Sequence, residues 1–236
     1  MTISAARLTR APDLHAGVAV ERRGEVPYGE AWTLQRELVR RRAASEILDT
    51  LLLLSHPPVV TLGKGGTIDH LLGSKADLAG RGVEFVETDR GGDITFHGPG
   101  QIVGYAIVDL APRDRDLHRF LRDLEEVLIQ ALAGFGIAAG RAAGLTGVWV
   151  GDAKVAAMGI RVSRWITHHG FALNVDTDLS YFDLIVPCGI AGRRVTSMAE
   201  LLGRPVERKR VEDALARAFA EVFGPGGLPR LGGEGR

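Results

Sequence analysis

The stretch GVWVGDAKVAAMGIRVSRWITHHGFALNV, residues 147–175, contains three short apolar segments separated by polar turn residues. These segments are residues 147–150, 154–162 and 168–175, and Gly-Asp at 151–152 separates the first two. Because Gly-Asp between apolar flanks favours a tight turn, we expect consecutive strands joined as hairpins. Strands in such runs are typical of an antiparallel or mixed sheet, and not of a doubly wound parallel sheet.

Helices are predicted between the runs of strands instead of after every strand. Apolar residues at helical spacing predict amphipathic helices over residues 28–45 and 116–135, and a last helix over 211–223. The capping-box pattern of Ser197 and Glu200 predicts the start of a short helix. The expected fold class is therefore α+β, with a mixed, largely antiparallel sheet flanked by helices.

The region between the first two helices adds further strand candidates. Residues 49–61 hold two apolar runs interrupted by a Pro-Pro pair, which predicts a hairpin or a bent pair of strands. Residues 83–88 and 102–110 are also strand candidates. They flank the glycine-dense segment 90–101, RGGDITFHGPGQ, which we expect to be loop.

Length and composition describe an ordinary globular chain. It has 236 residues, of which 45% are hydrophobic and 25% charged, enough to bury a sizeable core. No linker-like segment interrupts residues 15–223, which predicts a single catalytic domain over that range. The ends, residues 1–14 and 224–236, show little apolar periodicity and are expected to be flexible.

Charge and cysteine content exclude several classes of function. Lys+Arg 29 balances Asp+Glu 29, so the chain as a whole is not expected to bind nucleic acid or an anionic membrane. The single cysteine excludes an internal disulfide framework and a zinc site built from several cysteines. No apolar run is long enough for a membrane span or a signal peptide. We therefore expect a cytoplasmic protein that is not embedded in a membrane.

Three segments contain residues suited to chemistry. The glycines around His97 allow the backbone of 90–101 to approach a ligand, although the segment matches no phosphate-binding glycine motif. Lys154 opens an apolar strand, where burial would lower its pKa or a partner anion would hold its charge. Cys188, in IVPCGI at 185–190, follows a strand and precedes a predicted helix, whose N-terminal dipole favours a thiolate.

Each of these residues has a structural alternative when it is taken alone. The glycines suit a turn between strands, His97 a structural histidine, Lys154 a surface lysine and Cys188 a small buried apolar residue. His168 and His169 would place one imidazole on each face of a strand, but the spacing supplies no further metal ligands. We therefore predict no metal site.

Four motifs together resemble a known family. They are HGPGQ at 97–101, KVAAMGI at 154–160, HHGFALNV at 168–175 and PCGI at 187–190. In this order and spacing they closely resemble the lipoyl(octanoyl) transferases of the biotin/lipoate protein ligase superfamily, over roughly residues 25–205. The resemblance implies a catalytic domain with the biotin/lipoate ligase-like fold.

The resemblance also implies an acyltransferase of protein lipoylation and lipoate biosynthesis. Such an enzyme moves an octanoyl (or lipoyl) group from octanoyl-acyl carrier protein to a lysine of a lipoyl domain. The acceptors are lipoyl domains of 2-oxoacid dehydrogenases and the glycine cleavage H protein. Because the donor thioester is already activated, no cofactor and no ATP are implied.

The carrier proteins and lipoyl domains of this family's systems are acidic. Two interpretations of Arg40, Arg41 and Arg42 follow: they form a docking surface for these partners, or they are a solvated helix face.

Individual residues acquire roles from the same resemblance. Cys188 matches the nucleophile that carries the acyl group as a thioester, and Lys154 matches the lysine that lowers the thiol pKa and transfers protons. The residues that match substrate-binding positions are Arg90, Gly91, Gly92, Asp93, Ile94, Thr95, Phe96, His97, Ala157, Met158, Gly159, Gly170, Phe171 and Ala172. Met158 stands where the family has Leu or Ile, an apolar replacement that leaves the assignment intact. Phe96, Met158 and Phe171 are candidate walls of an apolar slot for the acyl chain.

Three other functions remain as alternatives. A lipoate or biotin protein ligase of the same superfamily would activate a free acid with ATP and would need no cysteine, and a GRGR-type biotin-adenylate loop is absent from the sequence. A non-catalytic lipoyl-domain binder would not need both Cys188 and Lys154. A thiol hydrolase would need an Asp or Asn that orients a Cys-His pair, and the sequence shows none in an obvious place.

Overall fold

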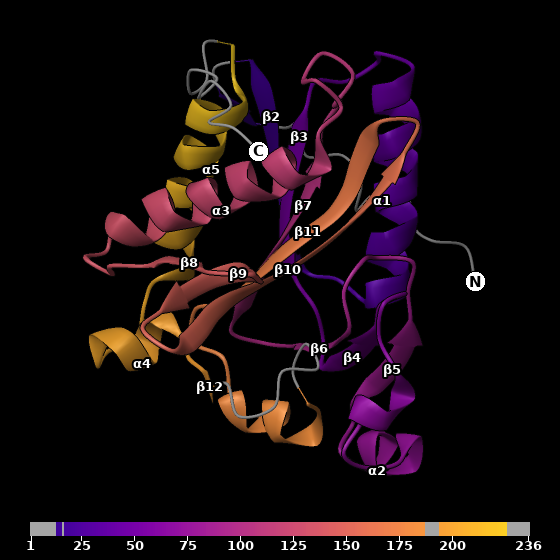
Figure 1. Ribbon diagram of the computed structural model, residues 1–236, viewed down its shortest axis with the longest axis vertical. Helices are drawn as coiled ribbons and strands as arrows, with labels where there is room; N and C mark the ends of the chain where they lie inside the picture. The colour runs from indigo at the N-terminus through magenta and orange to yellow at the C-terminus, as the bar shows by residue number, and fades with distance from the viewer. Residues whose placement is uncertain (1–12, 16, 187–193, 226–236) are drawn as a thin grey trace.

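The main sheet forms the centre of the molecule (Figure 1). The computed structural model describes residues 13–15, 17–186 and 194–225. Within them, nine strands follow the order β1-β2-β3-β7-β11-β10-β9-β8, with β12 beside β10. The strands are β1 (Asp13–His15), β2 (Val18–Glu25), β3 (Thr50–Ser55), β7 (Gln101–Ile107), β8 (Gly140–Ala142), β9 (Leu145–Val150), β10 (Ala153–Ser163), β11 (Ile166–Asn174) and β12 (Arg194–Val195). Most neighbours are antiparallel, but β2 with β3 and β10 with β12 are parallel, so the sheet is mixed as expected.

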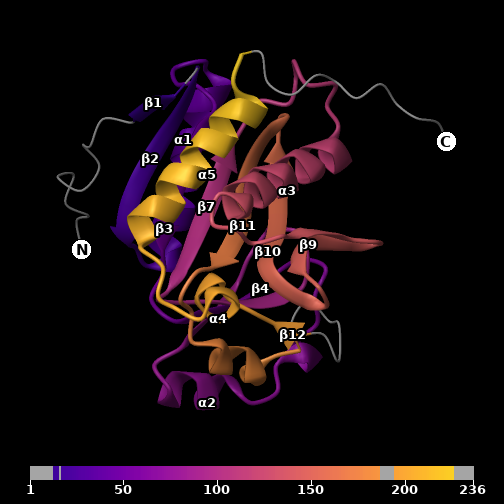
Figure 2. The same ribbon diagram turned by 90° about the vertical axis from the view of Figure 1, so that its left-hand side faces the viewer.

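Helices cover both faces of the main sheet (Figure 2). α1 (Tyr28–Ala43) packs on one face, against β7 and β11. α3 (Leu117–Ala133) and α5 (Arg208–Phe223) pack together on the other face. The layers are therefore helix, sheet, helix, with an apolar cluster on each side of the sheet.

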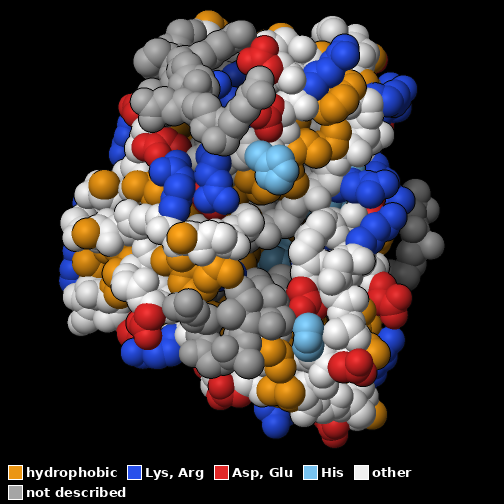
Figure 3. Space-filling view, viewed as in Figure 1, with side chains coloured by type: hydrophobic (Ala, Val, Ile, Leu, Met, Phe, Trp, Pro, Cys, Tyr) orange, Lys and Arg blue, Asp and Glu red, His pale blue; other side chains and the backbone are white. Residues whose placement is uncertain are grey.

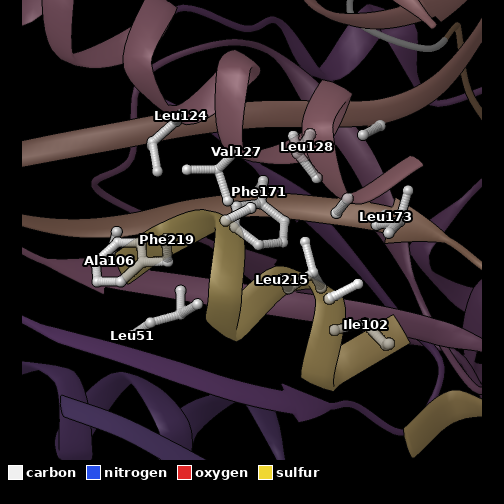
Figure 4. Packing of buried hydrophobic residues seen from close by; sticks show 14 of the residues in the cluster. Leu51, Ile102, Ala106, Leu124, Val127, Leu128, Phe171, Leu173, Leu215 and Phe219 are labelled. Atoms are coloured by element: carbon white, nitrogen blue, oxygen red, sulfur yellow. The ribbon is translucent and has the colours of Figure 1, made fainter. Parts of the chain in front are cut away.

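The residues of β3 alternate between these two clusters. Leu51 and Leu53 pack beneath α3 and α5, whereas Leu52 and Leu54 face α1. Figure 4 shows the first cluster, in which Phe171 of β11 lies among side chains of α3 and α5. The continuous apolar run of residues 51–54 is what burial on both faces of the sheet requires.

A second, smaller sheet lies beside the main sheet. Among the described residues it consists of β4 (Val59–Leu62) between β5 (Glu84–Glu87) and β6 (Ile94–His97). Its apolar residues pack with α2 (Lys75–Gly80) and with the 3-10 helix η3 (Leu179–Leu184). The remaining described helices are η2 (Ile68–His70) and α4 (Met198–Leu202).

The hairpin that the sequence suggested within residues 49–61 is wrong. Its two strands belong to different sheets, because β3 pairs with β2 and β7 while β4 pairs with β5 and β6. Pro57 and Pro58 have no backbone N–H for strand pairing and separate the two runs. The chain leaves the main sheet at this point and enters the second sheet.

Segment 90–101 is also not entirely loop, contrary to expectation. Its centre forms β6, which pairs antiparallel with β4 from Val59–His97 to Leu62–Ile94. Its sequence, Ile-Thr-Phe-His, does alternate apolar and polar residues, but the run has only four residues and lies between glycines, which favour loop. At the N-terminal end, Asp13 and Leu14 fall within the part expected to be flexible, yet they pair with β2.

The expected hairpins and helices are confirmed elsewhere. β10 pairs antiparallel with both β9 and β11, and Gly151 adopts a φ of +59° in the first turn. The Ser197 side chain accepts a hydrogen bond from the N–H of Glu200 at the start of α4. The α+β class is therefore confirmed. Of the helices described here, none combines the length and apolar character needed to cross a membrane.

Candidate active site

A cavity of about 320 Å³ opens between β6 of the second sheet and β10 and β11 of the main sheet. Figure 3 shows this face of the molecule hollowed near its centre. The cavity gathers the predicted substrate-binding residues, because all of them except Gly91 and Phe96 line it. Lys154 lines it as well. Residues from three distant parts of the sequence therefore meet in one place, as the resemblance implied.

Two of the three expected apolar walls have other roles. The Phe96 ring stacks on Tyr181 with 4.6 Å between centroids, inside the second sheet's core, and borders only a small adjoining cavity. The ring of Phe171 packs beneath α3 and α5, although the residue also borders the main cavity. The apolar residues that line the main cavity are Ile94, Val103, Leu145, Ala157, Met158, Phe171 and Ala172.

The loop that precedes β6 is fixed to both sheets. The Arg90 guanidinium is buried and donates from Nη2 to the carbonyl oxygen of Thr61 at 2.7 Å and to its hydroxyl at 2.8 Å. The N–H of Gly91 donates to the carbonyl of Ile160 on β10 at 2.8 Å. A Cβ on Gly159 would lie 2.6 Å from the Gly91 oxygen, so only glycine permits this close approach. Arg90 and Gly91 thus hold the loop in position.

Lys154 is held at the junction of the main cavity and the small adjoining one. Only 8% of the residue is exposed, and its Nζ lies 4.8 Å from the centroid of the Trp149 ring. The pairing of β9 with β10 shifts register between Lys154 and Ala156, next to the lysine. The alternative of an exposed surface lysine is therefore wrong.

Cys188 lies outside the described residues, in the segment 187–193. The described chain on either side of that segment is hydrogen-bonded near the cavity. Before it, the N–H of Val186 donates to the carbonyl of His70 at 2.7 Å. After it, the N–H of Thr196 donates to the carbonyl of Lys154 at 3.0 Å.

Tyr105 and His97 line the part of the cavity nearest α1, and the buried His56 lies behind Tyr105. His56 Nδ1 donates to the carbonyl of Val26, which leaves Nε2 to accept from the hydroxyl of Tyr105 at 2.7 Å. Burial lowers the pKa of His56 to about 4, and burial with the neighbouring His56 holds the pKa of His97 well below its usual value. Burial also raises the pKa of Tyr105 well above its usual value. These groups are therefore neutral at pH 7.

His168 and His169 both approach Asp89 instead of pointing to opposite faces of β11. His169 has a φ of +58°, which breaks the alternation of side chains along the strand. Asp89 Oδ1 lies 2.9 Å from His169 Nε2, and Asp89 Oδ2 lies 3.5 Å from His168 Nε2. The expectation of one imidazole on each face is wrong for this reason.

These three residues have ligand atoms close enough together to hold a metal ion. The surroundings do not favour a cation, because Arg36, Arg40, Arg161 and Arg164 line the pocket beside Asp89 and His168. Burial lowers the pKa of His168, and the charges of Arg161 and Arg36 lower it further against the opposing effect of Asp89. We therefore assign no metal to this cluster.

Several residues that line the cavity were not among the predicted substrate-binding residues, although His169 lies within the motif HHGFALNV. Tyr28 and Tyr105 enter it from α1 and β7, and His169 enters it from β11. A usable signal was the rarity of tyrosine, since the chain has 3 in all and two of them lie buried here. A buried tyrosine inside an apolar strand usually has a partner for its hydroxyl.

Comparison with known proteins identifies the family. Residues 27–220 match the family model of the lipoyl protein ligase A/B catalytic domain. The chain belongs to this family. An octanoyltransferase of Rubrobacter xylanophilus is 53% identical over 206 residues, which cover 86% of this chain and 92% of the relative. An octanoyltransferase of Gloeobacter violaceus is 52% identical over 87% of this chain and 91% of the relative.

Solved structures support the fold of this lipoyl protein ligase A/B family member. A bipartite lipoate protein ligase from Thermoplasma acidophilum superposes with a TM-score of 0.64 at 19% identity, over 86% of this chain and 83% of the other. Lipoate-protein ligase A bound with ATP gives a TM-score of 0.66 at 19% identity, over 85% of each chain. The family model and the octanoyltransferase relatives show that the chain is an acyltransferase of protein lipoylation and lipoate biosynthesis.

The three arginines at the end of α1 have partners within the chain. Arg40 pairs with Glu37 and Glu46, and Arg41 also pairs with Glu46. Arg42 pairs with Asp49 at 2.8 Å and with Asp109 at 3.6 Å. These pairs favour the interpretation of a solvated helix face over a dedicated docking surface.

Proposed function

We propose that the chain transfers an octanoyl group to a lysine of a lipoyl domain through a thioester on Cys188. The observation that carries the proposal is the buried Lys154 at the junction of two cavities, among the residues expected to bind substrate. Identity above 50% with octanoyltransferases, over most of each chain, supports octanoyl as the transferred group.

Octanoyl-acyl carrier protein is the donor in this proposal. The Cys188 thiolate attacks the thioester carbonyl, a new C–S bond forms, and the carrier leaves as a thiolate that takes a proton from the Lys154 ammonium. A free thiol with a pKa of about 8.5 is only a few per cent ionised at pH 7. An ammonium beside the sulfur stabilises the thiolate, which is the reason for a lysine near Cys188.

The lipoyl-domain lysine is the acceptor in the second step. Its amine attacks the acyl-enzyme, the amide C–N bond forms, and Cys188 leaves as a thiolate. Lys154, uncharged after the first step, accepts a proton from the attacking nitrogen. Because both steps start from a thioester, neither needs ATP.

The cavity lining suits a hydrocarbon chain. Burial contributes about 0.8 kcal/mol per methylene, so six methylenes give roughly 5 kcal/mol before the cost of ordering the chain. Val103, Leu145 and Met158 supply apolar contacts, and His97 and Tyr105 beside them remain uncharged at neutral pH. These apolar and uncharged side chains would contact an acyl chain, while the buried charged groups of the lining, Arg90 and Lys154, lie in the same cavity.

The proposed reaction also implies the acceptor proteins, the cellular location and the extent of the catalytic domain. The acceptors are the lipoyl domains of 2-oxoacid dehydrogenases and the glycine cleavage H protein, and the reaction takes place in the cytoplasm. Residues 15–223 act as one catalytic domain. The family match over residues 27–220 supports that extent.

A transfer assay with a desalted enzyme tests the proposal. Octanoyl-acyl carrier protein and an unmodified lipoyl domain are mixed with the enzyme and a metal chelator, without nucleotide. We expect the mass of the lipoyl domain to increase by one octanoyl group, and a domain whose acceptor lysine is replaced by arginine to stay unmodified. A strict requirement for ATP and free octanoate would assign the chain to the ligases instead.

A further inference from the structure

Glu125 of α3 is a fully buried carboxylate that the mechanism above does not use. The adjacent Leu124 belongs to the apolar cluster between α3, α5 and the main sheet. Glu125 Oε2 accepts hydrogen bonds from Arg122 Nη1 at 2.6 Å and from Arg141 Nε at 3.1 Å. Its Oε1 accepts the backbone N–H of Gly147 at 3.0 Å. The carboxylate therefore joins α3 directly to β9.

Gly147 is packed against Lys154. It has a φ of +117°, a conformation that favours glycine. A Cβ at this position would lie 2.7 Å from the carbonyl oxygen of Ala156 and 3.4 Å from Cε of Lys154. The pairing of β9 with β10 also shifts register between Lys154 and Ala156. Glu125 thus holds β9 at the point where its pairing with β10 is irregular and where the lysine side chain passes.

Two parts of the site extend from Gly147 in opposite directions along β9. Residues 144–146, which precede it, line the main cavity. Trp149 follows it by two residues and is the cross-strand partner of Lys154, whose Nζ lies 4.8 Å from the centroid of the indole ring. Two residues of a strand span only about 7 Å. A displacement of Gly147 would therefore move both the cavity wall and the ring beside the lysine.

Neutralisation of the two arginines does not account for the buried carboxylate. The side chains of Arg122 and Arg141 are 45% and 37% exposed, so water can solvate both guanidinium groups. Desolvation of a carboxylate costs several kcal/mol, and an apolar side chain of similar volume is often equally stable or more stable at such a position. Some proteins retain a buried charge because it selects one arrangement of the chain. The contact with Gly147 fits that role.

We propose that Glu125 is a positioning residue, which holds the backbone of Gly147 and thereby sets the position of Lys154 and of the cavity wall at residues 144–146. The inference rests on the proposed octanoyl transfer, in which Lys154 acts on the thiol and on the acceptor amine. Glu125 acts through Gly147 and exchanges no proton with the substrate.

Nuclear magnetic resonance of Lys154 tests this position without use of the reaction. The chain has four lysines, so the Cε signals of ¹³C-labelled lysine can be resolved, and Lys154→Ala identifies the signal of interest. The indole ring current shifts the resonances of the lysine next to it, so the shift reports how Lys154 lies against Trp149. We expect Glu125→Met, which fills similar space without an acceptor for Gly147, to move the signal toward that of an exposed lysine. Glu125→Gln keeps an acceptor oxygen and should move it less.

The rate of octanoyl transfer is measured on the same variants, per folded molecule as determined by urea unfolding. We expect Glu125→Met to transfer at least about tenfold more slowly than wild type, and Glu125→Gln to show a smaller loss. Glu126→Gln is the matched control, because Glu126 is the next residue and also pairs with Arg141, at 2.9 Å. Its Lys154 signal and its transfer rate should equal those of wild type.

Three outcomes would overturn the inference. They are an unmoved Lys154 signal in Glu125→Met, a moved signal with a wild-type rate of transfer, and an equal effect of Glu126→Gln. If Glu125→Met does not fold, an unmoved signal and a wild-type rate in Glu125→Gln would overturn it instead. Absence of both acyl-enzyme and transfer in wild type would reject the proposed function, whereas the Lys154 signal would still report whether Glu125 sets the position of the lysine.

Discussion

Lys154 and Trp149 are direct cross-strand partners on β10 and β9, and the ammonium lies 4.8 Å from the centroid of the indole ring. A cation over an aromatic face is stabilised as a cation, by about 0.5 to 2 kcal/mol depending on its exposure to solvent. The ring therefore provides a favourable contact for the side-chain nitrogen of a lysine that is only 8% exposed.

Replacement of Lys154 by alanine should slow acyl-enzyme formation far more than it lowers stability. Loss of the ammonium returns the thiol toward its ordinary pKa, and each unit of that change corresponds to about 1.4 kcal/mol between the two protonation states. The rate of alkylation of Cys188 as a function of pH measures the effect. An unchanged alkylation profile would show that Lys154 does not act on the thiol.

Lys154→Arg should separate the two steps of the reaction. Arginine keeps a positive charge but does not readily give up a proton, so it can support the thiolate and cannot act as the base for the incoming amine. We expect the variant to accumulate acyl-enzyme and to stall there in single-turnover transfer. Wild-type transfer would mean that Lys154 supplies charge alone.

Gly159→Ala should displace the loop of Arg90 and Gly91 from β10. The new Cβ would lie 2.6 Å from the Gly91 carbonyl oxygen. Because this oxygen belongs to the backbone, the clash cannot be relieved by rotation of a flexible side chain. Overpacking of this kind costs about 1 to 3 kcal/mol, and we expect transfer to fall at least about tenfold. Gly24→Ala is the control, since nothing lies within 4 Å of the corresponding Cβ. Equal activity of the two variants would argue against a role for this close approach.

The sequence predicted those helices and strands whose local spacing of apolar residues matches the face that they bury in the fold. The hairpins of residues 147–175 and the amphipathic α1 and α3 have the spacing of their own element and are confirmed. β6 was missed because its alternating run, Ile-Thr-Phe-His, has only four residues and lies between glycines that favour loop. β3 pairs with β7, a strand about 50 residues further along the chain. The two apolar runs of residues 49–61 carry no information about so distant a partner.

The motifs predicted which residues gather at the candidate site, but they did not predict which way individual side chains point. Lys154 and most of the residues that motif matching predicted to bind substrate line one cavity. It could not show that Phe96 points into the second sheet's core, because the strand's facing depends on its pairing with β4. It also missed the positive φ of His169, which turns that ring toward Asp89.

Phe96→Ala should therefore destabilise the fold more than it changes acyl binding. The ring is 1% exposed and stacks on Tyr181, so its removal leaves a cavity that costs about 3 to 5 kcal/mol. Urea unfolding measures this loss, and the transfer rate per folded molecule should stay within about threefold of wild type. A change in acyl chain-length preference with unchanged stability would contradict the position of the ring.

Stability should fall as the pH drops from about 6.5 to 4. Burial lowers the pKa of His169 to about 4, while the unfolded chain has the ordinary value near 6.5, so the unfolded state binds more protons in this window. The contribution of His169 is complete above pH 6.5 and is lost toward pH 4, up to about 3 kcal/mol as an upper figure. Urea unfolding of wild type and His169→Asn at several pH values should give a shallower slope for the variant. Asparagine suits the positive φ at this position, and identical slopes would contradict the assignment.

Intact-mass analysis of the enzyme after mixing with octanoyl-acyl carrier protein tests the central claim most directly. The account predicts that wild type gains one octanoyl group without nucleotide, that a peptide containing Cys188 carries it, and that Cys188→Ala gains none. An adduct that persists in Cys188→Ala, or wild type that transfers octanoyl to a lipoyl domain without ever showing the adduct, would contradict the covalent mechanism.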